Sequence, residues 1–112
     1  MTKNYNYQKH SIIAHAMYTY NSTMPGDKFT STDYDILCLV RSFHKSEHKL
    51  YMSYETLAKE LLVSKSTVKR SINRLIDAGF IEKHTTSKRS KYLTYNENAV
   101  KKFIYDMQQI DA

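Results

Sequence analysis

The chain has 112 residues, of which 41% are hydrophobic and 25% are charged, so it fits one small globular domain and not a disordered or two-domain protein. No apolar run approaches the roughly 20 residues of a membrane span, no secretory signal begins the chain, and a single cysteine, Cys38, excludes an internal disulfide framework. The net charge of +6 lies between Ser64 and Lys91, where eight cations stand against two anions, whereas the charges of the remaining residues cancel. This segregation indicates contact with nucleic acid.

The first quarter of the sequence predicts a polar arm followed by a helix. Residues 1–10 are polar and without a clear period, which is typical of a flexible arm. Apolar residues recur at helical spacing from about Gln8 to Tyr20, which predicts a helix there. The segment from Asn21 to Lys28 holds the only proline and predicts a loop.

A second helix is expected to begin after a cap at Ser31 or Thr32. Its buried stripe would consist of Ile36, Leu37, Val40 and Phe43, with Cys38 as a small buried hydrophobe in the same stretch. A polar connection covers residues 44–49, and a very short strand is expected over residues 50–52.

Residues 53–79 predict two helices joined by a tight turn. Ser53 is a good N-cap for the first helix, and Ser64 is a good N-cap for the second, which would continue to Ala78. Gly79 stands where a helix C-terminus needs left-handed geometry.

The second of these helices has two different faces. One face is apolar and consists of Val68, Ile72, Leu75 and Ile76. The other face carries cations and hydrogen-bonding side chains, namely Lys65, Ser66, Lys69, Arg70, Asn73 and Arg74. A helix that anchors one face in a core and offers the other to a DNA major groove is built in this way.

The last third of the sequence predicts a hairpin and a final helix. Residues 80–84 and 91–95 are plausible strands, joined by a polar basic tip at residues 85–90. Asn96 would cap a helix over residues 96–110 with an apolar stripe of Val100, Phe103, Ile104, Met107 and Ile110. The expected fold class is therefore mainly α with a small β-hairpin.

This order of elements resembles the winged helix-turn-helix family, with extra N- and C-terminal helices. The residues that carry the resemblance are Ser53, Thr56-Leu57-Ala58, Leu61, Val63-Ser64, Thr67-Val68, Arg70, Ile72, Leu75 and Gly79-Phe80-Ile81. Within the family, the chain looks most like small replication, partition and transfer proteins of bacterial plasmids and phages. Leu62 departs from the pattern, since many such turns have glycine there; a left-handed non-glycine costs roughly 1 kcal/mol, so a slightly remodelled turn is expected.

The resemblance implies that residues 53–79 form the helix-turn-helix and residues 80–95 the wing. The second helix would enter the major groove of double-stranded DNA, and the wing would meet the backbone or the minor groove. The implied groove-facing residues are Lys65, Ser66, Thr67, Lys69, Arg70, Asn73 and Arg74. The implied wing contacts are Lys83, Lys88, Arg89 and Lys91, and the implied phosphate contacts at helix starts are Ser53, Tyr54 and Ser64. For Thr67, a purely local hydrogen bond in the first turn is the competing interpretation.

The apolar stripes of the first and last helices predict a homodimer, because a lone domain of this size should bind a half-site weakly. The candidate interface residues are Met17, Tyr18, Phe103, Ile104 and Met107. The competing interpretation is that both stripes complete the core of the monomer.

The most favoured role from the sequence is an origin- or operator-binding accessory factor of a plasmid or phage in the bacterial cytoplasm. Its further expected partners are other proteins of a replication, partition or transfer complex. The alternatives are a chromosomal transcriptional repressor, the DNA-binding part of a larger initiator, and a winged helix used only for protein contact. An enzyme is not expected, and no cofactor or metal is implied: His44 and His48 lie four residues apart, but no third ligand stands close to them in the sequence.

Overall fold

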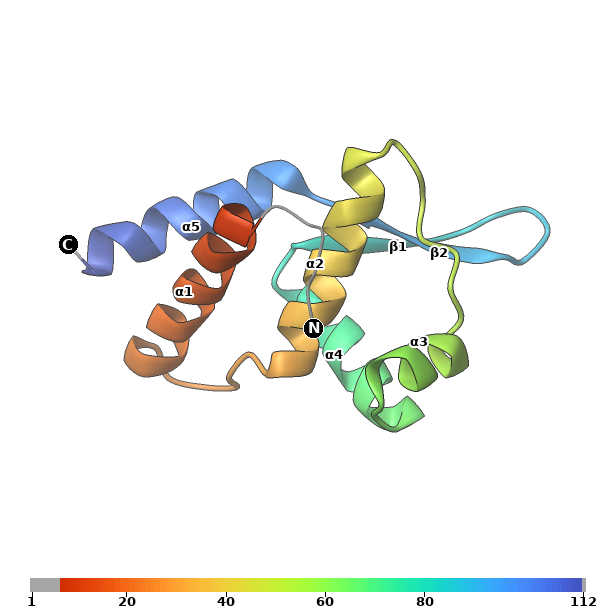
Figure 1. The fold of residues 1–112 in the computed structure, drawn as a ribbon, viewed down its shortest axis with the longest axis horizontal. Coiled ribbons are helices and arrows are strands. Elements are labelled where there is room, and N and C mark those ends of the chain that lie inside the picture. Colours follow the sequence, from red (N-terminus) through yellow and green to blue (C-terminus); the bar gives the residue numbers. More distant parts are fainter. Residues whose placement is uncertain (1–6, 112) are drawn as a thin grey trace.

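The computed structural model describes residues 7–111, and Figure 1 shows their arrangement. The elements are α1 (Tyr7–Thr23), α2 (Ser31–Lys45), α3 (Tyr54–Leu61), α4 (Lys65–Asp77), β1 (Ile81–Thr85), β2 (Lys91–Tyr95) and α5 (Glu97–Asp111). The predicted fold class, mainly α with one hairpin, is confirmed. Residues 1–6 of the predicted arm lie outside the described residues, and residues 7–10 belong to α1 instead of the arm.

The core forms where α2 crosses α4 and α4 packs on α3. The predicted stripes meet there: Ile36 and Leu37 of α2 and Val68, Ile72 and Leu75 of α4 are all fully buried. Apolar residues at i, i+4 and i+7 place their side chains on one side of a helix, so a single face of α4 is enough to anchor it. The opposite face of α4 is left to the solvent.

The cap of α2 lies one residue before the predicted candidates, Ser31 and Thr32. Thr30 is the N-cap: its side chain accepts a hydrogen bond from the backbone N–H of Asp33, while the Asp33 carboxylate accepts one from the backbone N–H of Thr30 at 3.0 Å. This reciprocal capping box fixes Asp33 at the start of α2 and leaves its side chain fully buried.

The hairpin projects from the body of the molecule, on the side away from α1 and α5 (Figure 1). β1 and β2 are antiparallel, with Ile81 opposite Tyr95 and Lys83 opposite Leu93. The short strand expected over residues 50–52 is a single bridge, in which Leu50 exchanges backbone hydrogen bonds with Leu93. The base of the wing is therefore anchored by buried residues, and its tip is not.

The turn between α3 and α4 does not remodel to avoid left-handed geometry at Leu62, so that expectation is wrong. Leu62 has φ 58° and ψ 44°, and the backbone N–H of Val63 donates to the carbonyl of Ala58 at 3.0 Å, which closes the end of α3. The Leu62 side chain is 90% exposed, so packing does not offset the strain.

Replacing Leu62 with glycine should raise the free energy of unfolding by about 1 kcal/mol, because glycine adopts the left-handed region without strain. Urea denaturation measures the change. Leu62→Ala is the matched control, since it removes the same exposed side chain but keeps the strained Cβ. Equal stability of the Gly and Ala variants would contradict this account of the turn.

Candidate nucleic-acid interface

Two serine caps set the positions of α3 and α4. The Ser53 hydroxyl accepts a hydrogen bond from the backbone N–H of Thr56 at 3.2 Å, and the Ser64 hydroxyl accepts one from that of Thr67 at 3.1 Å. Both caps were predicted. Because these hydroxyls satisfy orphan N–H groups, capping alone accounts for both serines, although both remain exposed.

The outer face of α4 presents most of the residues that the sequence assigned to the groove. Five of them are exposed: Lys65, Ser66, Lys69, Arg70 and Asn73. Thr67 is half-buried and its hydroxyl lies 2.8 Å from that of Ser64, so its local interpretation has direct support. Arg70 donates from Nη2 to Thr67 Oγ1 at 3.4 Å, which draws its guanidinium toward the start of the helix.

Arg74, which was assigned to the groove-facing set, has a structural partner instead. It donates from Nε and Nη2 to the two carboxylate oxygens of Asp33, at 2.7 and 3.1 Å. The bond to Asp33 raises the pKa of Arg74, and the carboxylate is fully buried while the guanidinium is mostly covered. A two-point ion pair of this kind holds α4 against α2, and we remove Arg74 from the DNA-facing set.

The wing tip exposes Lys88, Arg89 and Lys91, as the resemblance implied. Its turn is organised by Thr86, whose Oγ1 accepts hydrogen bonds from the backbone N–H groups of Lys88 and Ser90 at 3.2 and 3.1 Å. Arg89 occupies the left-handed position of the turn, with φ 66°, where glycine is the residue without strain. A strained, charged residue at a solvent-exposed tip motivates a functional hypothesis for Arg89.

Arg89→Gly should therefore separate stability from binding. We expect the free energy of unfolding to rise by about 1 kcal/mol, because the strain is removed, while DNA affinity falls because one cation is lost. Urea denaturation and fluorescence anisotropy with duplex DNA measure the two effects, and Arg89→Ala, which keeps the strain, is the control. A Gly variant that bound DNA as tightly as the wild type would exclude Arg89 from the interface.

Lys83, the fourth implied wing contact, is exposed but has a partner within the chain. Its ammonium donates to the hydroxyl of Tyr54 at 3.0 Å and lies 5.4 Å from the centre of the same ring. Tyr54 is the first residue of α3, so this contact joins the inner side of the wing to the start of the helix-turn-helix.

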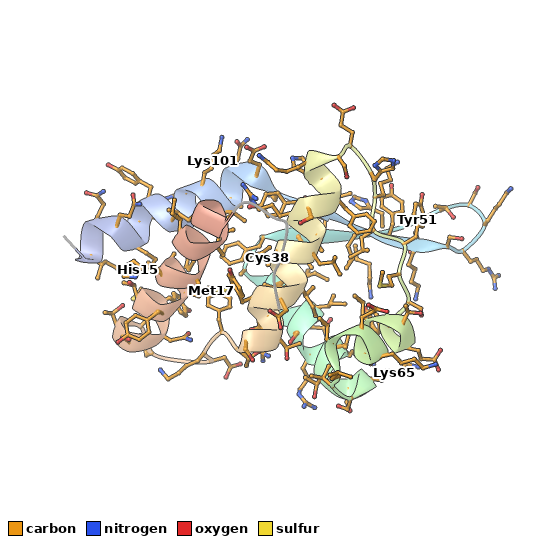
Figure 2. The ribbon with its side chains drawn as sticks, in the orientation of Figure 1. His15, Met17, Cys38, Tyr51, Lys65 and Lys101 are labelled. Carbon is orange, nitrogen blue, oxygen red and sulfur yellow. The ribbon has the colours of Figure 1, made fainter. Side chains whose placement is uncertain are left out.

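A cleft of about 340 Å³ separates the start of α3 from the wing. It is lined by Tyr51, Met52, Ser53, Tyr54, Glu55, Lys65, Arg89 and Lys91. Figure 2 shows Lys65 at the α3–α4 end of the molecule and Tyr51 beside the hairpin. Three cations from α4 and the wing thus border one cleft, against a single carboxylate, Glu55, which lies 4.0 Å from Lys65. The sequence indicated the cations but gave no sign that Tyr51 closes the cleft on one side.

Most of the residues proposed for a dimer interface pack inside the monomer instead. Met17 and Met107 are buried, and Phe103 packs in an aromatic cluster with Tyr20, Phe29 and Phe80. Figure 2 shows Met17 on the inner side of α1. Ile104 is half-buried, and Tyr18 alone among the five is well exposed, at 69%. The competing interpretation therefore holds for the two methionines and Phe103.

The described residues give little support for a metal site, a reactive cysteine or a membrane span. Among the side chains that the structure describes, no three or more of His, Cys, Asp or Glu are arranged to hold a metal ion. Cys38 is buried as predicted, and burial raises the pKa of its thiol to about 11. Among the described helices, none has the length and apolar character needed to cross a membrane.

A family model described as a helix-turn-helix domain matches residues 30–81, from α2 to the start of the wing. No curated protein matches the chain in sequence. Several solved structures are similar over most of the chain, among them the three that follow. The ST1889 protein of Sulfolobus tokodaii is 22% identical, with a TM-score of 0.57 over 92% of this chain and 87% of its own. MepR of Staphylococcus aureus, a transcription regulator of a multidrug efflux pump, is 15% identical, with a TM-score of 0.55 over 98% and 76%. The S. aureus MepR–DNA complex is 12% identical, with a TM-score of 0.52 over 93% and 69%.

These likenesses show that the chain has the winged helix-turn-helix fold. The narrower likeness to plasmid and phage replication, partition or transfer proteins finds no support among them, since MepR is a regulator of transcription.

Proposed function

We propose that this protein is a sequence-specific double-stranded DNA-binding protein, with α4 in the major groove and the wing on the backbone or minor groove. One observation carries the proposal: Lys65 of α4 borders the same cleft as Arg89 and Lys91 of the wing. The exposed face of α4 and the wing therefore place three cations around one cleft, an arrangement that suits the phosphate backbone. Arg70 and Asn73 on that face have the donor groups that pair with guanine and adenine edges.

The role that we propose is regulation of transcription, most simply as a repressor in the bacterial cytoplasm. It is supported by the similarity to MepR, which is a transcription regulator and has been solved in a complex with DNA. The accessory role in replication, partition or transfer has no comparable support. A winged helix used only for protein contact would give no reason for all of the net charge to lie within residues 64–91.

We also propose that the protein acts as a homodimer through α1 and α5, which lie side by side (Figure 1). The interface is revised to the apolar residues that the monomer leaves exposed on these helices, Ile12, Tyr18, Tyr105 and Ile110. An apolar groove of about 210 Å³ between the two helices, bordered by Ile12, Ala16, Ile104 and Met107, adds surface that a second copy would cover.

Selection of preferred sites from random duplex DNA tests the proposal. The expected result is an inverted repeat whose half-sites are about one helical turn, roughly 10 base pairs, apart. Sites that overlap promoters in the neighbouring genome would support regulation of transcription, whereas tandem sites beside an origin would favour the accessory role. Enrichment of no sequence would contradict specific binding, and a single unrepeated site would contradict the dimer.

A further inference from the structure

Lys83 differs from the other cations of the wing in its surroundings. Lys88 and Arg89 are exposed at the tip. Lys91 and Lys83 share the hairpin face that carries the buried Leu93, and Lys83 lies directly opposite Leu93. Its ammonium is bound to the Tyr54 hydroxyl at 3.0 Å and lies over the Tyr54 ring. A cation held by both a hydroxyl and an aromatic face loses freedom to reach for a phosphate.

The Lys83–Tyr54 contact joins the α3 wall of the cleft to a wing residue that does not line the cleft itself. Tyr54 stands on the α3 wall and is packed against the hydrophobic core, and Lys83 belongs to β1 of the wing. The wing is also held by the Leu50–Leu93 bridge, at the same register as Lys83, and by Tyr92, whose ring lies 5.2 Å from that of Tyr51 and 4.9 Å from the ammonium of Lys49. These contacts join the wing to residues 49–51, and the Lys83–Tyr54 contact adds a direct link from β1 to the first residue of α3, which fixes the orientation of the wing relative to α3.

The cleft suits a single phosphate group of the DNA backbone. Lys65, Arg89 and Lys91 border it from α4 and the wing, and Ser53, the N-cap of α3, borders it at the start of that helix, where the helix dipole favours an anion. Glu55 is the only carboxylate on its border, and it stands within 4.0 Å of Lys65.

We infer that Lys83 is a positioning residue: through Tyr54 it holds the wing at the distance from α3 at which Lys65, Arg89 and Lys91 bind one DNA phosphate in the cleft. The inference rests on the proposed DNA binding and assigns opposite roles to two lysines of the same wing. Lys91 binds the phosphate directly, and Lys83 only sets the geometry. Loss of Lys83 weakens binding because the wing must be ordered when DNA binds, but the bound state keeps its phosphate contacts.

The salt dependence of DNA affinity separates the two roles. The salt slope, taken as the magnitude of the slope of log K against log salt, falls by about one for each phosphate contact that is lost. The experiment measures anisotropy with a labelled duplex for the full chain and for Lys83→Met, Tyr54→Phe, their double variant, Lys91→Gln and Lys59→Gln. Lys59 is an exposed cation of α3 outside the cleft and serves as the charge control. Thermal unfolding of each variant shows whether an effect on binding reflects a loss of folding.

Lys83→Met and Tyr54→Phe should each weaken binding by about two- to tenfold, the range of one net hydrogen bond, and the double variant should be no weaker than the weaker single variant. Their salt slopes should equal that of the wild type, whereas Lys91→Gln should lower the slope by about one and Lys59→Gln should change nothing. The inference is overturned if Lys83→Met lowers the slope by about one, if the two single effects add, if either is absent, or if Lys91→Gln keeps the slope. Wild-type protein that bound no DNA would instead refute the proposed function itself.

Discussion

Arg74→Ala is expected to lower the free energy of unfolding by about 3–5 kcal/mol, the range for removing one partner of a buried ion pair. Asp33 is fully buried, and Arg74 supplies two hydrogen bonds to its carboxylate. Without Arg74 the buried carboxyl group loses both of these hydrogen bonds and, among the described residues, keeps the one from the backbone N–H of Thr30. Urea denaturation monitored by far-UV circular dichroism measures the loss.

The matched control is Lys69→Ala, which removes an exposed cation from the same helix and should change stability by less than about 0.5 kcal/mol. If Arg74→Ala cost less than about 1 kcal/mol, the pair would not be what holds α4 against α2. Arg74 would then return to the set of candidate DNA contacts.

Arg70→Ala should reduce the discrimination between preferred and altered sites by about 1–3 kcal/mol, or roughly 5- to 150-fold, because Arg70 is placed to read a base edge. The Lys88→Ala and Arg89→Ala double variant should instead weaken binding by a similar factor on every sequence, because the wing tip contacts the backbone. Affinities for the selected site and for single-base variants of it measure both effects. A change of site preference caused by the wing pair alone would transfer base readout from α4 to the wing.

Much of the fold follows from local patterns in the sequence. Val68, Ile72 and Leu75 recur at helical spacing and are fully buried, and both Ser53 and Ser64 cap the helices that they precede. These features depend on residues within one or two turns of each other, which is the range in which periodicity and capping are informative.

The contacts that the sequence did not reveal join residues far apart in the chain. Arg74 and Arg70 are both arginines on the polar face of the same predicted helix, so the sequence alone does not distinguish them. Only the packing of α2 on α4 brings Arg74 to Asp33, 41 positions earlier. Lys83 similarly meets Tyr54, 29 positions earlier, only because the fold brings β1 near the start of α3. Met17 and Met107 could line either a dimer interface or a core, and the packing of α1 on α5 places them in the core.

The central claim is that the cations of α4 and the wing bind the DNA backbone together, and the salt dependence of affinity tests it most directly. Anisotropy of a labelled duplex should show the dissociation constant of the wild-type chain rising roughly 100-fold between 50 and 200 mM NaCl, as about four phosphate contacts would produce. No binding, or an affinity that changes by less than about threefold over this range, would contradict the claim.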